Sequence, residues 1–267
     1  MYFGFRNISI RYGKKSVVDN VSLEFPQGKI VTIIGQNGCG KSSLLKTVSH
    51  AVRPSSGEII FRGRSIRDYG SKEIAKKIAY LPQVHSSPPD IDVRTLVSYG
   101  RYPYMRLGRG LRRDDTEAID EALSLTGLTE LSGQAVSTLS GGERQRAWIA
   151  MTICVKPEVL ILDEPTTYLD ISYQVEVLEL VRSLNRTLGI TIVMVLHDLN
   201  LASRYSDLLY AIKDRGVCAA GSPVEVITQD NLRRIFDIDA RVFEDCLNKC
   251  PYFIPLKTVF HTEVTEK

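Results

Sequence analysis

The sequence predicts an α/β fold built on a mainly parallel sheet. Short apolar runs, which are typical of buried strands, alternate with segments of helical periodicity along most of the chain. The strongest runs are Lys29–Ile34, Val159–Leu162 and Thr191–Leu196. In addition, residues 2–25 alternate apolar and polar side chains around a turn at residues 12–15, which predicts an antiparallel β arm at the N-terminus.

The remaining elements are predicted from the same periodicities and from turn residues. In chain order they are a helix over Ser43–Val48, a turn over Pro54–Gly57, a strand over Glu58–Phe61, a helix over Ser71–Ile78, a strand over Ile78–Leu81, a largely helical region from Val93 to about Val155 that ends in a helix over Glu143–Cys154, and a helix over Ile171–Leu188 that stops at Gly189.

We expect one domain over residues 1–267 with an insertion. Its core is formed by residues 1–84 and 156–236, and residues 85–155 form an inserted helical subdomain. Residues 82–90, which contain three prolines, predict a hinge between the two. Residues 237–267 form a C-terminal extension, in which Arg241–Glu244 and Tyr252–Ile254 have β character but no predicted place.

Composition excludes several classes of protein. With 43% hydrophobic and 24% charged residues, the chain resembles a soluble globular protein, and no apolar run approaches the roughly 20 residues of a membrane span. The net charge of +3 gives no reason to expect nucleic acid as a partner. No secretory signal is visible, and the five cysteines are scattered. The closest pair, Cys246 and Cys250, lacks partners at metal-ligand spacing, so reduced thiols and a cytoplasmic address are expected.

The run Gly35-Gln36-Asn37-Gly38-Cys39-Gly40-Lys41-Ser42 has the spacing of a phosphate-binding loop between a strand and a helix. Its glycines let backbone N–H groups close around phosphate oxygens, and the helix N-terminus adds its positive end. Lys41 is predicted to reach the β- and γ-phosphates, and the Ser42 hydroxyl to ligate Mg²⁺. Ser43 is included in the predicted nucleotide site. The alternative, a glycine-rich turn with a surface lysine, is disfavoured by this placement.

Two carboxylates end the strand before Pro165. Alternation along the strand places Asp163 and Glu164 on opposite sides, so they should have different partners. Asp163 is predicted to bind in the Mg²⁺ shell, directly or through water. Glu164 is predicted to act as the general base that polarises the attacking water, a role that contributes ~10²–10⁴-fold. Without the upstream loop, the same pair would indicate only a solvated turn.

A second anion site is predicted at Ser140-Gly141-Gly142, which begins the helix that contains Glu143. A hydroxyl, exposed amides and a helix N-terminus lie together there. Taken alone, the run would indicate only a helix N-cap.

The order of these motifs resembles the ATP-binding cassette (ABC) ATPases, a family with a P-loop NTPase core. The resemblance is carried by Leu139-Ser140-Gly141-Gly142-Glu143-Arg144-Gln145 shortly before Leu160–Pro165, and it extends from Tyr2 to about Phe236. It implies that ATP and Mg²⁺ are bound, and that Ser140, Gly141, Gly142 and Glu143 contact the γ-phosphate held by a second copy of the chain. A head-to-tail dimer would then complete two sites.

The same resemblance implies roles for four further residues. Gln83 contacts Mg²⁺ and the attacking water at the hinge, and His197 contacts the γ-phosphate. Tyr12 stacks on adenine, although a tyrosine that covers the core is a serious alternative. Asp170, in Tyr168-Leu169-Asp170, lies at the dimer interface.

A finer resemblance is to the ATPase subunits of importers for ferric siderophores, haem and cobalamin. It is carried by residues 144–151, residues 166–171 and Gly100-Arg101-Tyr102-Pro103-Tyr104. It implies membrane permease subunits as partners, a substrate-binding protein as an indirect partner, and a place on the cytoplasmic face of the membrane. The segment Arg101–Arg113 holds five arginines and is predicted to dock the permease; a solvated loop is the alternative.

Three other functions stay open from the sequence. They are the ATPase of another transport system, a non-transport ABC ATPase such as one for iron–sulfur assembly, and a module that binds ATP without cleaving it. Glu164 and His197 argue against the last. Neither the transported ligand nor the role of residues 237–267 follows from the sequence.

Overall fold

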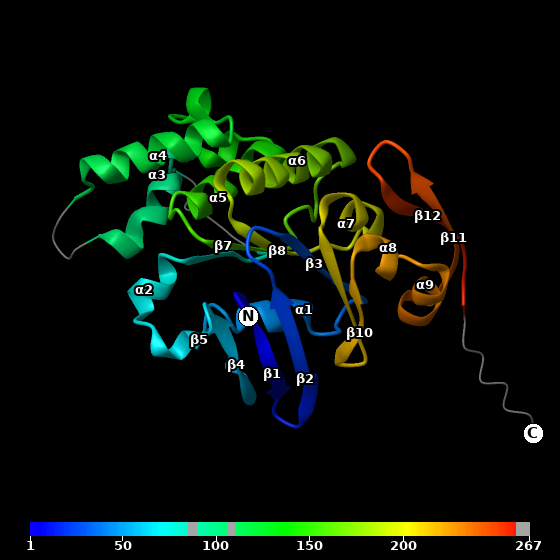
Figure 1. The fold of residues 1–267 in the computed structure, drawn as a ribbon. Helices are drawn as coiled ribbons and strands as arrows, with labels where there is room; N and C mark the ends of the chain where they lie inside the picture. Colours follow the sequence, from blue (N-terminus) through cyan, green and yellow to red (C-terminus); the bar gives the residue numbers. More distant parts are fainter. Residues whose placement is uncertain (85–89, 106–109, 260–267) are drawn as a thin grey trace, which may run out of the picture.

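A six-stranded sheet lies at the centre of the computed structural model, which describes residues 1–84, 90–105 and 110–259 (Figure 1). Its neighbouring strands are parallel except β10 and β9. In spatial order they are β10 (Gly216–Gly221), β9 (Leu208–Lys213), β3 (Ile30–Gly35), β8 (Thr191–Val195), β7 (Val159–Asp163) and β6 (Ile78–Leu81). The predicted α/β class and mainly parallel sheet are confirmed.

Both faces of this sheet are buried, each in its own apolar cluster. On β7, Leu160 and Leu162 face one cluster, whereas Val159 and Ile161 face the other. Strand β8 alternates in the same way. Because successive side chains point to opposite faces, a strand covered on both sides must be apolar throughout. This is why these runs show no polar alternation in the sequence.

The N-terminal β arm covers one face. β1 (Phe3–Tyr12) pairs antiparallel with β2 (Lys15–Phe25), as predicted, and on its other side with β4 (Ser56–Phe61), beyond which lies the short β5 (Arg64–Ser65). The Phe25 ring lies 5.4 Å from that of Phe3 and 5.7 Å from that of Phe5, within the range of favourable aromatic contacts. Helix α1 (Lys41–Lys46) buries Leu44 and Leu45 in the same cluster, between the arm and the central sheet (Figure 1).

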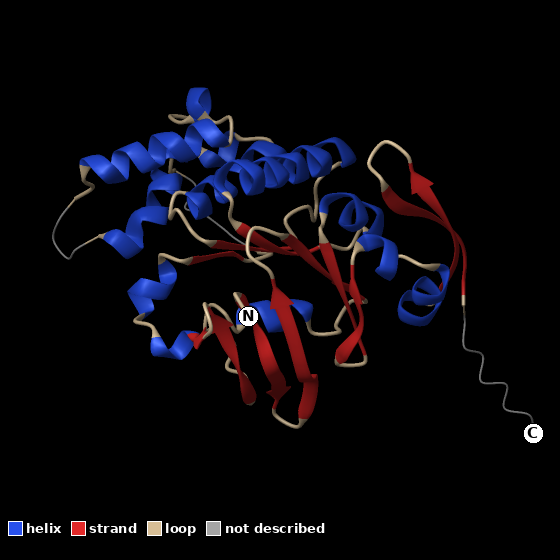
Figure 2. Cartoon of the chain, viewed as in Figure 1, coloured by secondary structure: helices blue, strands red, loops and turns tan. Residues whose placement is uncertain are grey.

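Helices cover the other face (Figure 2). They are α3 (Val93–Ser98), α4 (Arg113–Leu125), α5 (Gly141–Ile153), α6 (Ile171–Leu188) and α7 (Leu199–Tyr205), with 3₁₀ turns η2 (Tyr99–Tyr104), η3 (Thr129–Leu131) and η4 (Val136–Thr138). Among the described residues, none of the helices has both the length and the apolar content needed to cross a bilayer. The division into core and inserted subdomain stays a prediction.

Helix α6 shows why the sequence is informative here. Its buried side chains are Val177, Leu178, Val181 and Leu184, which the helical period places on one stripe. The helix ends at Gly189, whose φ of 65° is the left-handed conformation that glycine adopts without strain. The predicted bounds of this helix are confirmed.

Three other helices differ from their predicted bounds. α5 runs over Gly141–Ile153 rather than Glu143–Cys154, because its first turn begins directly after the N-cap Ser140. α1 begins at Lys41 rather than Ser43, because its first turn is already formed within the glycine-rich loop. α2 (Ser71–Ala75) ends before Ile78, because Ile78 pairs with Val159 as the first residue of β6. A 3₁₀ turn, η1 (Ile66–Asp68), precedes α2.

The C-terminal extension contains a β hairpin. After the helices α8 (Pro223–Val226) and α9 (Gln229–Phe236), β11 (Ile238–Asp245) pairs antiparallel with β12 (Cys250–Thr258). The Asn200 side chain of α7 both donates to and accepts from the backbone of Phe253, which fixes β12 on α7. The two segments of unplaced β character therefore form one hairpin at one side of the molecule (Figure 1).

Part of the arginine-rich segment that was predicted to dock the permease is buried. Arg101 is buried: its Nε donates to Asp115 at 2.9 Å, and its Nη1 donates to the carbonyl of Cys154 at 2.9 Å. Burial alone would raise the pKa of Asp115, but hydrogen bonds from the Arg112 backbone and from Arg101 outweigh it and hold that pKa below its usual value. Arg106 and Arg109 lie outside the described residues. Arg101 therefore stabilises the helical layer, and the prediction that it docks a partner is wrong.

We expect Arg101→Ala to lower the free energy of unfolding by about 3 kcal/mol, because it leaves the Asp115 carboxylate buried without its partner. Urea denaturation at pH 7 measures the change. Arg113→Ala is the matched control, since Arg113 is 91% exposed in its pair with Glu117 and should cost below about 1 kcal/mol. Equal costs for the two variants would contradict a structural role for Arg101.

Candidate functional site

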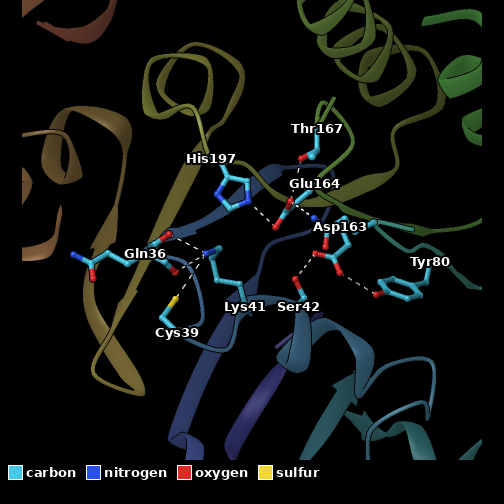
Figure 3. A network of polar contacts seen from close by, with 11 residues as sticks. Gln36, Cys39, Lys41, Ser42, Tyr80, Asp163, Glu164, Thr167 and His197 are labelled. Carbon is cyan, nitrogen blue, oxygen red and sulfur yellow. Dashed lines mark hydrogen bonds and ion pairs between the residues drawn. The ribbon is translucent and has the colours of Figure 1, made fainter. Parts of the chain in front are cut away.

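The carboxyl ends of β3, β8 and β7 lie next to one another at one edge of the central sheet. In the register of the strands, Ile33 pairs with Val195 and Val195 pairs with Asp163. The segments that follow these strands therefore begin side by side. They carry the glycine-rich loop, His197 and Glu164 (Figure 3). This edge is where α/β proteins generally bind their ligands.

The loop after β3 needs its glycines. Gly35 has a φ of 152°, and a Cβ there would overlap the carbonyl oxygen of Ile212. Gly40 has a φ of 101°, and a Cβ there would lie 2.7 Å from Cγ2 of Val18. Larger residues fit neither position. The loop is thus shaped by close backbone approaches, with Asn37 and Gly38 exposed at its crest, and it has the form of a phosphate cradle.

Lys41 points into the loop rather than into solvent. The residue is 4% exposed, and its Nζ donates to the carbonyls of Gly35 at 2.8 Å and Gln36 at 2.9 Å, with Cys39 Sγ at 3.8 Å (Figure 3). A buried ammonium is costly unless it meets an anion or several acceptors. The position therefore suits an incoming phosphate, and the alternative of a surface lysine is wrong.

Ser42 and Asp163 meet at the start of α1. Asp163 is 1% exposed; its Oδ1 accepts from the Ser42 hydroxyl at 2.9 Å and its Oδ2 from the Tyr80 hydroxyl at 3.2 Å. Burial raises the pKa of Asp163, and these two hydrogen bonds oppose the rise. Burial and the Asp163 carboxylate raise the pKa of Tyr80, so the phenol stays protonated and donates. A hydroxyl beside a carboxylate is a ligand pair that fits Mg²⁺.

The Glu164 carboxylate is surrounded by three side chains from different segments. Its Oε2 accepts from Gln83 Nε2 at 2.5 Å and from Thr167 Oγ1 at 3.0 Å. Its Oε1 lies 2.6 Å from Nε2 of His197 (Figure 3). Glu164 has a φ of 54°, in the left-handed region that non-glycine residues rarely adopt. Such backbone geometry is concentrated at functional sites.

Asp163 and Glu164 have different partners, as their alternation predicted. Asp163 contacts Ser42 and Tyr80, whereas Glu164 contacts Gln83, Thr167 and His197. The structure thus brings Lys41, Ser42 and both carboxylates together from segments far apart in the sequence.

The start of α5 is built from a reciprocal cap. The Ser140 hydroxyl accepts from the Glu143 backbone N–H at 3.3 Å, and the Glu143 carboxylate accepts from the Ser140 backbone N–H at 2.9 Å. Hydrogen bonds from the Ser140 side chain and backbone lower the pKa of Glu143. The interpretation as an N-cap therefore holds for this chain. Gly141, the first residue of the helix, is exposed.

Tyr12, Tyr168 and Asp170 lie outside the buried network. Tyr12 ends β1 and is 51% exposed, and its hydroxyl contacts Ser43 Oγ at 3.4 Å; this exposure disagrees with the alternative that it covers the core. Tyr168 is 94% exposed with a φ of 66°. Asp170 is exposed at the N-cap of α6, before Ile171, which is 80% exposed.

Two contacting residues were missed by the sequence reasoning. Tyr80 meets Asp163 because β6 lies beside β7, a strand order that no local pattern reveals. Thr167 meets Glu164 across the turn after Pro165. Its signal was its place three residues after a predicted catalytic carboxylate, since threonine readily bonds nearby groups in turns.

Gly142 offers a test of how tightly α5 and α6 pack at this point. A Cβ at Gly142 would overlap Cδ1 of Tyr173, whereas one at Gly141 would meet only the flexible end of Leu169 at 3.3 Å. We expect Gly142→Ala to lower the free energy of unfolding by about 1–3 kcal/mol through overpacking, and Gly141→Ala by clearly less. Urea denaturation compares them, and Tyr173→Ala in the Gly142→Ala background should restore part of the loss. A Gly142→Ala protein as stable as the Gly141→Ala protein would refute the contact.

Known proteins share the fold of this chain and much of its sequence. A family model described as ABC transporter matches residues 18–167. The chain is 45% identical over 248 residues to the probable siderophore transport system ATP-binding protein YusV of Bacillus subtilis, covering 93% of this chain and 90% of that protein. It is 44% identical to the ferric enterobactin transport ATP-binding protein FepC of Escherichia coli, covering 93% and 92% of the two chains.

Solved structures of ABC transporter proteins have the same fold. A putative metal-chelate type ABC transporter in an inward-facing conformation has a chain with a TM-score of 0.83 at 26% identity, covering 96% of this chain and 97% of that one. The ATP-binding cassette MJ0796, solved as a dimer bound to ADP and Pi, gives 0.69 at 26% identity, covering 82% and 98%. Because the family model spans more than half of the chain and relatives match almost all of it, this chain belongs to the ABC transporter family and is one of its ATPases.

Proposed function

We propose that this chain is the ATP-hydrolysing subunit of an importer for ferric siderophores or related iron complexes. The observation that carries the proposal is the complete set of contacts around Glu164, in a chain 45% identical to a siderophore transport ATP-binding protein. A module that only binds ATP would not need a carboxylate aligned by an amide, a hydroxyl and an imidazole. The similarity to FepC, named for ferric enterobactin, supports the substrate class.

In this proposal, the loop over Gly35–Ser42 holds the triphosphate of ATP. Lys41 exchanges its two carbonyl acceptors for phosphate oxygens, and the N-terminus of α1 adds its positive end. Ser42, Asp163 and Gln83 would hold Mg²⁺, which when bound neutralises charge that develops on the phosphates. Tyr12, half exposed beside Ser43, is available to stack on adenine.

Glu164 is the proposed general base. Its carboxylate accepts a proton from the attacking water, and His197, adjacent at 2.6 Å, fixes its orientation and faces the γ-phosphate. Gln83 bonds the same carboxylate from the segment after β6, so a movement of that segment would change the surroundings of the base.

A second copy of the chain is the proposed source of the missing contacts. Ser140, Gly141, Gly142 and Glu143 begin α5, and in a head-to-tail pair they would face the phosphate bound by the partner. The exposed Tyr168 and Ile171 next to Asp170 support an interface on this side of the molecule. That MJ0796 was solved as a dimer is consistent with this arrangement.

Permease subunits are the proposed membrane partners, with a substrate-binding protein as an indirect one. Val84, Tyr99 and Tyr102 are 80%, 48% and 75% exposed, and they follow β6 or lie in η2. With Arg112 and Arg113 they replace the buried Arg101 in the proposed docking surface. The chain would then work on the cytoplasmic face of the membrane.

We expect Glu164→Gln to bind ATP but to lower its hydrolysis by about 10²–10⁴-fold, because the amide cannot accept the proton of the attacking water. In a strain that lacks this gene, the wild type should restore uptake of a labelled ferric siderophore and Glu164→Gln should not. ATP titration of the purified variant and uptake by the complemented cells are the two measurements.

Glu58→Gln is the matched control, because Glu58 is a partly exposed carboxylate of β4 that pairs with Arg6 and belongs neither to the contacts around Glu164 nor to the proposed docking surface. It should keep both hydrolysis and uptake. If the Glu164→Gln variant hydrolysed ATP at the rate of the wild type, Glu164 would not be the general base. Unchanged siderophore uptake in the deletion strain would refute the proposed substrate class.

A further inference from the structure

The C-terminal extension and the glycine-rich loop are joined by one carboxylate. Asp237 Oδ2 accepts from Gln36 Nε2 at 2.6 Å, and Asp237 Oδ1 accepts from Lys213 Nζ at 3.1 Å. Asp237 thus bridges the first side chain of the loop and the last residue of β9. The proposed roles of the loop residues make no use of these contacts.

The register of the sheet explains why these groups meet. Gly35 at the end of β3 pairs with Ile212 of β9, so Gln36 and Lys213 leave the sheet at the same edge. Lys213 Nζ also donates to the carbonyl of Arg234 at 2.6 Å, which holds the end of α9 against β9. Asp237 follows as the C-cap of α9 in the left-handed conformation, with φ 57°. The side chain of Asp237 is therefore held beside the loop by two elements that do not bind nucleotide.

The contact continues from Gln36 to Lys41. The main-chain carbonyl of Gln36 accepts from Lys41 Nζ at 2.9 Å, while its side chain donates to Asp237. On its outer side the loop borders a cavity of about 270 Å³, lined by Gln36, Asn37, Gly38, Cys39, Lys15 and Lys213 among others. The crest of the loop is exposed there, and the Gln36 side chain ties the loop to Asp237, which lies outside the loop.

The tail hairpin begins at the same residue. The carbonyl of Asp237 accepts from the backbone N–H of Val259, and the pairing of β11 with β12 starts one residue later, at Ile238 with Thr258. The hairpin is also fixed to α7, which begins two residues after His197, through Asn200 and Ser203. The extension is therefore tied to segments on both sides of the proposed nucleotide site.

We propose that Asp237 is a positioning residue for nucleotide binding, acting through Gln36 to hold the loop in its phosphate-binding shape. The proposal rests on ATP binding at this loop. A loop rich in glycine loses much conformational freedom when it closes on a phosphate, and an outside anchor lowers that cost before ATP arrives. Residues 237–259 then have a role in the nucleotide site in addition to their packing.

Asp237→Gly in the full-length chain is the main test. Glycine adopts the left-handed conformation without strain, so the variant removes the carboxylate while keeping the C-cap of α9. We expect its Kd for ATP to rise about fivefold, the size expected for one lost hydrogen bond. The fall in Tm should be small, because the lost pair with Lys213 is partly exposed. Asp237→Asn, which keeps an acceptor for Gln36 but loses the charge facing Lys213, should give a smaller rise.

Asp239→Asn is the matched control. Asp239 lies two residues along β11 and pairs with Arg233 and Lys257 instead of the loop, so its Kd for ATP should equal that of the wild type. A double-mutant cycle with Gln36→Ala separates positioning from general destabilisation. If Gln36 and Asp237 act through the one contact that they share, the double variant should bind ATP no more weakly than the weaker-binding single variant.

Two results would overturn the proposal. One is an unchanged Kd for ATP in Asp237→Gly. The other is a double variant whose rise in Kd equals the product of the rises in Gln36→Ala and Asp237→Gly. Failure of the wild-type chain itself to bind ATP would instead refute the proposed function. The two failures are therefore distinguishable.

Discussion

The register of three parallel strands is the constraint on which the site depends. Ile33, Val195 and Asp163 lie in one row across the sheet, so the loops that follow begin at the same level. Asp163 continues the alternation of Val159 and Ile161 and therefore points to the face covered by α1, where Ser42 lies in the first turn of the helix. A slip of one residue in β7 would exchange the two faces and direct Asp163 away from Ser42. Because both faces of β7 and β8 are apolar, hydrophobicity alone does not oppose this slip. The close packing of the two buried clusters opposes it, since side chains of different size and shape would have to exchange places. The buried core and the geometry of the site are therefore specified by the same residues.

The Glu164 carboxylate connects this edge of the sheet to segments from different parts of the chain. Gln83 follows β6 just before the described residues are interrupted, Thr167 lies in the turn before α6, and His197 follows β8. Each contacting side chain comes from a different segment, so a shift of any one segment would change the contacts of the carboxylate. The tail hairpin, fixed to the loop through Asp237 and to α7 through Asn200, adds a fourth segment to the same region.

Much of the fold and of the candidate site could be predicted from the sequence, because the informative signals are local. The strands around Ile161 and Val193 are apolar runs, α6 has a single apolar stripe that ends at Gly189, and the loop before Ser42 has its glycines at fixed spacing. What could not be predicted depends on contacts between distant segments. Strand order places Tyr80 beside Asp163, and the charge of Arg101 looks like a surface feature until Asp115 is known to lie beside it. In the tail, the β character of Arg241–Glu244 and Tyr252–Ile254 was recognised, but their pairing and their packing on α7 were not, because both depend on contacts between segments.

In the proposed dimer, each ATP site takes its loop from one copy and the start of α5 from the other. Mixed dimers, purified with two different tags and carrying Glu164→Gln to prevent turnover, test it directly through the number of ATP molecules they retain. A Lys41→Ala chain paired with a Ser140→Arg chain should retain one ATP, because one loop and the facing Ser140 are both intact. A chain with both substitutions paired with an otherwise unchanged chain should retain none, because each site then contains one defect. Equal retention by the two mixed dimers would contradict the claim.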